Sequence, residues 1–255
     1  MDHHHIIHDP SQVKIFAELF VPLKAHQAIN LSLIARRKYA PTLTESAYIL
    51  QRVIIGGDEN RTRAEDHLYR YLLRLECPVG SYIDKEERPI PDESLAVYAF
   101  IDPKDTIKAL SSTLHECVER MSNGDSLPNA FNLYKEQITK TKSIGGEKYR
   151  QLDIDTKDSE NIQIVRDLLF RAKIKPLITV ETRGGYHVIY RNKKEIDHKF
   201  LHDFKKSTVF EKPNVYGVST KDYWFSITGY SMMIVPGTYQ GGFKTKISKI
   251  FESPN

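Results

Sequence analysis

The sequence predicts an α/β or α+β protein in which helices flank a mixed or antiparallel sheet. Two observations predict this class. From residue 91 to residue 255, short apolar runs typical of strands alternate with segments of helical spacing, and Gly184-Gly185 separates two strand-like runs as in a hairpin. Residues 1–90 have mainly helical patterns. We therefore expect a helical N-terminal region over residues 1–90 and a sheet domain over residues 91–255.

Three helices are predicted in the N-terminal region. Asp9-Pro10 supplies an N-cap and a first-turn proline for the first helix, and Thr42 with Glu45 matches a capping box ahead of the second. The predicted helices cover residues 10–23, 46–54 and 63–76. Segment 85–94 is charged and contains two prolines, which predicts a linker to the sheet domain.

The sheet domain is predicted to alternate strands with helices. Its strands are expected within residues 94–101, 149–157, 176–182, 186–191, 223–227 and 231–235. Its helices are expected over residues 105–121, 131–140, 159–174 and 197–206. This pattern leaves room for one sheet with helices packed against it.

Composition indicates a globular protein of the cytoplasm. The chain has 255 residues, of which 40% are apolar and 27% charged, and its net charge of +4 is compatible with a polyanionic partner. No apolar run approaches the roughly 18 residues of a membrane helix, and the start lacks the apolar core of a signal peptide. Two cysteines do not indicate a disulfide framework, so we expect a reducing compartment and no membrane partner.

Two clusters of metal-binding residue types carry little weight. The histidine-rich segment 3–8 lies at a terminus, where disorder is the expectation. Cys77, His115 and Cys117 lack the C-x₂-C spacing of common zinc sites. Neither cluster predicts a metal site.

Two aspartates lie one residue apart inside an apolar run, in YRQLDIDTK at residues 149–157. In a strand, Asp153 and Asp155 point to one face while Leu152 and Ile154 point to the other. A solvated strand end explains this pattern without a ligand. A divalent cation, Mg²⁺ or Mn²⁺, is the alternative explanation, because carboxylate oxygens are its preferred ligands and its charge offsets their repulsion.

A second polar element follows in ETRGGYHVIYR, residues 181–191. Gly184 and Gly185 allow a tight turn or a close approach to a ligand, and His187 lies just past them. Thr182, Arg183, the backbone amides and His187 together suit a polyphosphate. A plain hairpin with a structural histidine is the alternative.

A third element, residues 222–242, begins with Asp222 and contains a Pro236-Gly237-Thr238 turn. An ordinary strand-turn-strand explains it without any ligand. This element matters only because it follows the other two elements in the sequence.

The order of the three elements resembles the archaeo-eukaryotic primase superfamily, the primase-polymerases. The motifs of that family are an h-D-h-D strand (h, hydrophobic), an S-G-x-G-x-H segment and a later acid behind a hydrophobic residue. Segment 152–156, LDIDT, matches the first motif. Segment 182–187, TRGGYH, resembles the second, with Thr182 in place of the serine and Arg183 in place of the first glycine.

The third motif departs from the family pattern. Asp222 follows a lysine rather than an apolar residue, and Asp197 and Asp203 lie nearer to His187, so the identity of the third acid stays open among the three. The resemblance covers roughly residues 92–245 and leaves the N-terminal region unassigned.

The resemblance implies a template-dependent nucleotidyltransferase, a DNA primase, a DNA polymerase or both. Asp153, Asp155 and Asp222 would carry Mg²⁺ or Mn²⁺, and His187 would contact the triphosphate of an incoming nucleotide. The same pocket would be lined by Thr182, Arg183, Gly184 and Gly185. The implied partners are nucleoside triphosphates, a single-stranded DNA template, and a helicase or other replication protein.

A single-stranded template needs basic and aromatic residues to hold it. Candidates for this role are Arg36, Arg37, Lys38, residues 140–142, Lys205, Lys206, Tyr239 and Lys244. Each of them is also compatible with an ordinary solvated surface. Trp224, between two other aromatic residues, is expected to be core rather than a base-stacking platform.

Two other functions are compatible with the same residues. A metal-dependent nuclease would use the same acids to cleave nucleic acid. A non-catalytic single-stranded nucleic-acid-binding module would bind without turnover.

Overall fold

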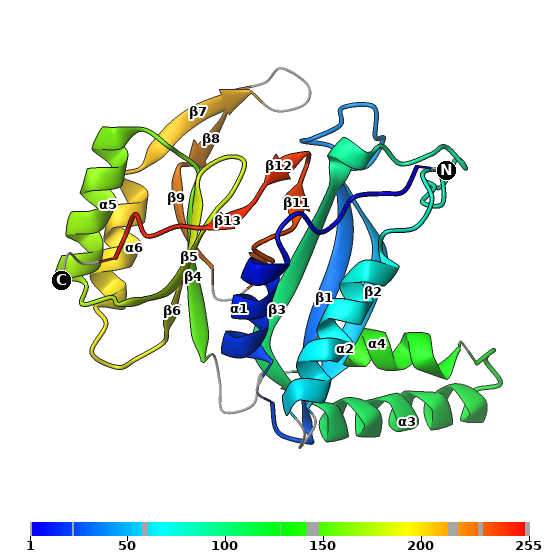
Figure 1. Cartoon of the computed structure of the whole chain (residues 1–255). Helices are drawn as coiled ribbons and strands as arrows, with labels where there is room; N and C mark the ends of the chain where they lie inside the picture. Colours follow the sequence, from blue (N-terminus) through cyan, green and yellow to red (C-terminus); the bar gives the residue numbers. More distant parts are fainter. Residues whose placement is uncertain are drawn as a thin grey trace.

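The computed structural model describes residues 2–21, 23–57, 61–127, 129–141, 148–213, 219–228 and 232–252. Within these residues, the strands form a six-stranded, a five-stranded and a two-stranded sheet, and helices pack beside the two larger ones (Figure 1). The predicted mixed α/β class with antiparallel sheets and flanking helices is confirmed. None of the helices in the described residues has the length and apolar character that crossing a bilayer requires.

The six-stranded sheet, called the first sheet below, is built mainly from the N-terminal half of the chain. Its strands are β1 (Gln27–Arg36), β2 (Ala47–Gly56), β3 (Leu95–Asp105), β10 (Met232–Ile234), β11 (Tyr239–Gln240) and β12 (Phe243–Lys244). They follow the order β12-β11-β3-β1-β2, with β10 also paired to β3. The elements beside this sheet are α1 (Pro10–Phe20), α2 (Arg61–Arg74), α3 (Thr106–Ser122), α4 (Ala130–Lys140) and the 3₁₀ turn η1 (Asp92–Ser94). Phe16 of α1 and Leu72 of α2 join Leu33 and Val97 of the sheet in one apolar core.

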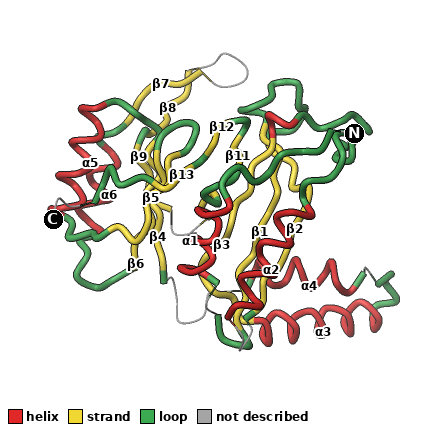
Figure 2. The backbone as a smooth tube through the Cα atoms, viewed as in Figure 1, coloured by secondary structure: helices red, strands yellow, loops and turns green. Residues whose placement is uncertain are grey.

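The five-stranded sheet, called the second sheet, carries the predicted acid pair. Its strands are β4 (Tyr149–Ile154), β5 (Pro176–Glu181), β6 (Tyr186–Arg191), β9 (Phe225–Thr228) and β13 (Lys246–Ile247), in the order β13-β5-β6-β4-β9. Its helices are α5 (Ser159–Arg171) and α6 (His198–Lys206), and β7 (Val209–Pro213) with β8 (Ser219–Tyr223) forms the two-stranded sheet. Apart from β7 and β8, which lie between α6 and β9, the chain order β4, α5, β5, β6, α6, β9 is that of a β-α-β-β-α-β unit (Figure 2). Leu168 of α5 and Leu201 of α6 cover Leu152 and Val188 of this sheet.

The prediction of a helical region over residues 1–90 is wrong where β1 and β2 lie, whereas α1 and α2 match two of the three predicted helices. The helix predicted over residues 46–54 is strand β2, which pairs antiparallel with β1. This segment is rich in β-branched residues, which favour a strand once a partner strand is available. Glu45 does not complete a capping box but forms an ion pair with Lys85 at 2.5 Å. Because β1 also pairs with β3, the first sheet extends across the boundary predicted near residue 90.

The histidine-rich start belongs to the fold, contrary to the expectation of disorder. His4 is fully buried, and its backbone N–H donates to the Cys77 carbonyl at 2.9 Å while its imidazole contacts Asp92. The His8 Nε2 lies 2.8 Å from the Thr245 carbonyl. These partners are far away in the sequence, so a local pattern could not reveal them.

The C-terminal part of the chain joins the two larger sheets. After β9 in the second sheet, β10 and β11 pair with β3 of the first sheet, and β13 then pairs with β5 of the second. The turn predicted at Pro236-Gly237-Thr238 is present, with Gly237 at a positive φ of 82° and the Thr238 hydroxyl donating to the Val235 carbonyl at 2.7 Å. The two sheets are therefore held with a shared space between them, where the predicted site residues gather.

Candidate active site

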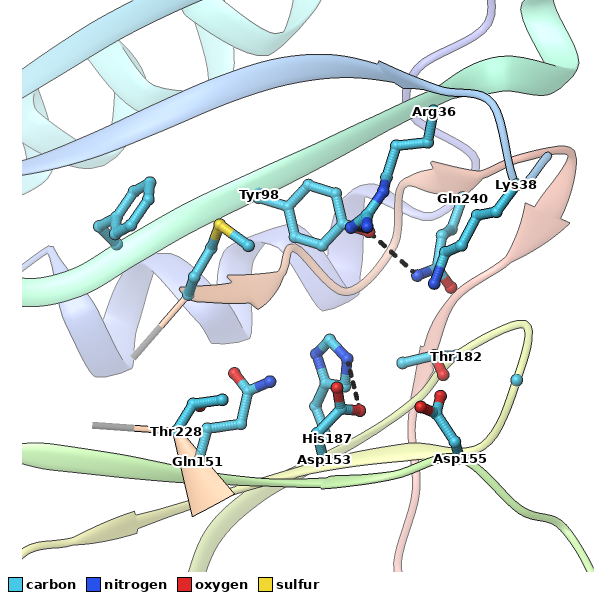
Figure 3. A pocket seen from close by; sticks show the side chains of 13 residues that line it. Arg36, Lys38, Tyr98, Gln151, Asp153, Asp155, Thr182, His187, Thr228 and Gln240 are labelled. Atoms are coloured by element: carbon cyan, nitrogen blue, oxygen red, sulfur yellow. Dashed lines mark hydrogen bonds and ion pairs between the residues drawn. The ribbon is translucent and has the colours of Figure 1, made fainter. Parts of the chain in front are cut away.

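A pocket of about 300 Å³ lies between the two larger sheets (Figure 3). The first sheet and its loops contribute Arg36, Lys38, Tyr98, Phe100, Met232 and Gln240, and the second contributes Gln151, Asp153, Asp155, Thr182, Gly184, His187 and Thr228. The pocket therefore brings together acids from one sheet and cations from the other.

The predicted acid pair shares one face of the second sheet. Gln151, Asp153 and Asp155 occupy alternate positions along β4 and its C-terminal end, and all three line the pocket (Figure 3). Leu152 and Ile154 point the other way and are fully buried in the core under α5 and α6. The backbone N–H of Asp155 donates to the Trp224 carbonyl at 2.8 Å, which continues the pairing of β4 with the β9 edge beyond the end of the strand.

His187 is oriented by both sheets. It is directly opposite Asp153 in the register of β4 and β6, and its Nε2 lies 3.4 Å from the Asp153 Oδ1. The backbone N–H of Ile234, on β10 of the first sheet, points at Nδ1 from 3.4 Å. With Nδ1 as the acceptor of that N–H, a neutral ring carries its proton on Nε2, facing the carboxylate.

The surroundings of Asp153 keep its carboxyl group ionised. Burial raises the pKa of Asp153, but the adjacent His187 imidazole and the positive charges of Lys38 and Arg36 act more strongly together, so the net pKa lies below the usual aspartate value. A depressed pKa contributes stability above the unfolded-state pKa, and this contribution is lost as pH falls through the folded-state pKa. At neutral pH the pocket therefore contains a permanent anion next to cations.

The Gly184-Gly185 turn approaches the acid pair closely. A Cβ atom added to Gly185 would lie 1.8 Å from the Ile154 carbonyl oxygen, and one added to Gly184 would lie 3.3 Å from the Asp155 Oδ1. Thr182 closes the turn: its N–H donates to the Gly185 carbonyl at 2.8 Å, and its Oγ1 accepts from the Gly185 N–H at 3.1 Å. Glycine at position 185 is required because two backbone segments touch there.

Arg183 was predicted to line this pocket, but its side chain lies outside the pocket. Its guanidinium donates to the Gly241 carbonyl at 2.9 Å and lies over the Tyr39 ring, 5.4 Å from the centroid. Its backbone N–H donates to the Gln240 Oε1 at 2.7 Å. Arg183 thus ties the turn to the first sheet. Gly185 likewise supports the turn without lining the pocket.

Only some of the pocket residues that the first sheet contributes were predicted from the sequence. Arg36 and Lys38 were singled out as basic residues able to hold a nucleic acid strand, and both line the pocket. Tyr98 was not identified as a site residue, yet its hydroxyl lies 3.4 Å from the Arg36 Nη1 and accepts from the Gln240 Nε2 at the same distance. Tyr98 lies within an apolar run, and such a run predicts that all of its side chains are buried in the core.

The three candidates for the third acid differ in their surroundings. Asp197 caps α6, accepting from the Phe200 N–H at 2.8 Å, and Asp203 is paired with Lys206 on the same helix at 3.3 Å. Neither lines the pocket. The backbone of Asp222 belongs to β8, two residues before Trp224, whereas its side chain lies outside the described residues.

The donor set suits a cation that arrives with a phosphate-bearing ligand. Among the described residues, no group of three or more His, Cys, Asp or Glu side chains is arranged to hold a metal ion by itself. Mg²⁺ commonly binds through one or two carboxylates, completed by waters and substrate phosphates. Asp153 and Asp155 fit that requirement, with Arg36 and Lys38 across the pocket available for the phosphates.

Comparisons with protein-family models, with curated proteins and with solved structures found no match to this chain. The chemistry of the pocket is therefore inferred from its own residues.

Proposed function

We propose that the protein is a template-dependent nucleotidyltransferase, a DNA primase or DNA polymerase that makes or extends primers on single-stranded DNA. The observation that carries the proposal is the arrangement of Asp153, Asp155 and His187 on one sheet, facing Arg36 and Lys38 of the other across one pocket. Acids for a divalent ion and cations for phosphates are what a metal-bound nucleoside triphosphate requires. The finer fold assignment, an archaeo-eukaryotic-primase-like catalytic domain, is part of the same proposal and rests on the motif resemblance.

In this proposal, Asp153 and Asp155 hold Mg²⁺ or Mn²⁺, with Asp222 as the candidate third acid. When bound, such an ion supplies charge stabilisation for in-line displacement at phosphorus. The depressed pKa of Asp153 keeps its oxygens available as acceptors at neutral pH. The Nε2–H of His187 provides a hydrogen-bond donor at the pocket wall, and Arg36 and Lys38 neutralise phosphate charge. The protein thus contributes positioning and electrostatics, the main requirements of phosphoryl transfer.

A synthesis assay tests the proposal. The protein is incubated with unprimed single-stranded DNA, nucleoside triphosphates and Mn²⁺ or Mg²⁺, and labelled products are separated on a denaturing gel. We expect short products that disappear when the metal is chelated or the nucleotides are left out, because both are needed to form the reactive complex.

The same assay separates the two alternative functions. Shortening of a labelled strand with metal but without nucleotides would indicate a nuclease using the same acids. Salt-sensitive binding with neither synthesis nor shortening would indicate a non-catalytic binding module, since phosphate contacts give binding a steep salt dependence. Either result would reject the proposal.

A further inference from the structure

Within the described residues, some of the buried polar atoms without a hydrogen-bond partner lie in the pocket wall. They include the Gln151 Oε1 and the Thr228 Oγ1. Leaving such an atom unpaired costs about 1–3 kcal/mol, so folded proteins rarely tolerate it without a ligand or an ordered water. Gln151 is only 3% exposed, and both residues line the pocket. The two atoms therefore indicate a polar ligand group at this end.

The two side chains lie side by side at a defined distance from the acids. Gln151 pairs with Thr228 in the register of β4 and β9, and both are on the pocket side of the sheet (Figure 3). Gln151 precedes Asp153 by two positions on the same face, which is about 7 Å along a strand. On the opposite wall, Phe100 and Met232 are cross-strand neighbours and supply apolar surface.

The chemistry of the pair suits a hydroxyl group. An amide oxygen only accepts hydrogen bonds, whereas a threonine hydroxyl can donate or accept. Together Gln151 and Thr228 can accept from and donate to one ligand hydroxyl, which itself does both. In a nucleotide held by its phosphates near Asp153, the first hydrogen-bond donors beyond the α-phosphate are the hydroxyls of the sugar.

We propose that Gln151 and Thr228 bind a sugar hydroxyl of the nucleoside triphosphate, so that the pocket distinguishes ribonucleotides from their deoxy analogues. This inference rests on the proposed function, which supplies the nucleotide and its orientation. A site built to hydrogen-bond a hydroxyl discriminates against the analogue without it, because its buried groups then stay unpaired.

Equilibrium binding tests this inference without requiring synthesis. The affinities of ATP, 2′-deoxy-ATP and 3′-deoxy-ATP are measured by calorimetry in the presence of Mg²⁺, for the wild type and for Thr228→Val and Gln151→Leu. We expect one deoxy analogue to bind the wild type about tenfold or more weakly than ATP. Each variant should bind ATP as weakly as that analogue while its affinity for the analogue stays unchanged. Gln163→Leu, the same substitution on the exposed face of α5, serves as the control.

The outcomes separate this inference from the proposed function. Equal binding of all three nucleotides, or an equal loss of all three in both variants, overturns the sugar assignment while leaving the nucleotide site intact. Absence of binding by every nucleotide removes the proposed function and this inference together.

Discussion

Replacing Asp153 or Asp155 by asparagine is expected to abolish primer synthesis. The amide keeps the shape of the side chain but removes the negative charge that holds a divalent cation. Loss of about 4 kcal/mol of metal-based charge stabilisation lowers the rate about a thousandfold. The measurement is the initial rate of nucleotide incorporation on a single-stranded template, at saturating metal and nucleotide.

A control carboxylate makes the result specific. Asp167 is exposed on α5 and hydrogen-bonded only to the Gln163 amide among the contacts described, so Asp167→Asn should keep the wild-type rate. Circular dichroism should show the same fold for all three variants. Wild-type synthesis by both Asp153→Asn and Asp155→Asn would show that these acids do not bind the catalytic metal.

The second large effect is structural. Gly185→Ala should lower the free energy of unfolding by about 3 kcal/mol, measured by chemical denaturation, because the added methyl group would meet the Ile154 carbonyl oxygen at 1.8 Å. The three atoms nearest to the added methyl group, the Ile154 carbonyl oxygen and carbon and the Thr156 nitrogen, all belong to the backbone, so none can turn aside as a flexible side chain would. Relief of the clash requires the turn to move away from β4, and with it the pocket wall at Thr182 and Gly184.

The matched control is Gly56→Ala at the end of β2. A Cβ atom added there has no other atom within 4 Å, so this substitution should change the unfolding free energy by less than about 1 kcal/mol. Similar stability losses for Gly56→Ala and Gly185→Ala would contradict the close approach of the turn to β4.

Several features were predictable because they depend on local patterns. The alternation of Leu152 and Ile154 with Asp153 and Asp155 put the acids on one face, and the pocket contains both. Gly184-Gly185 and the following apolar run predicted the turn and strand that bring His187 opposite Asp153. Helical spacing predicted α1, α3 and α5 near their observed bounds, and Asp9-Pro10 predicted where α1 begins.

Other features failed or were missed because they depend on distant partners. A helix was predicted over residues 46–54, but this segment forms a strand because it pairs with β1. Arg183 was predicted to line a polyphosphate pocket, but its guanidinium contacts the Gly241 carbonyl and the Tyr39 ring outside the pocket. Gly241 is more than fifty residues later in the sequence, and Tyr39 is more than a hundred residues earlier.

The amino-acid sequence by itself therefore determined the mixed fold class, the shared face of the two aspartates and the glycine turn beside them. These follow from periodicity and backbone freedom, which act over a few neighbouring residues. Only the tertiary structure decided that Arg36 and Lys38 would face the acids. It also decided that the Gln151 Oε1 and the Thr228 Oγ1 would be buried in the pocket wall without a hydrogen-bond partner among the described residues. Charge complementarity and burial arise when two sheets meet, and strand pairing between distant segments, not local spacing, sets how they meet.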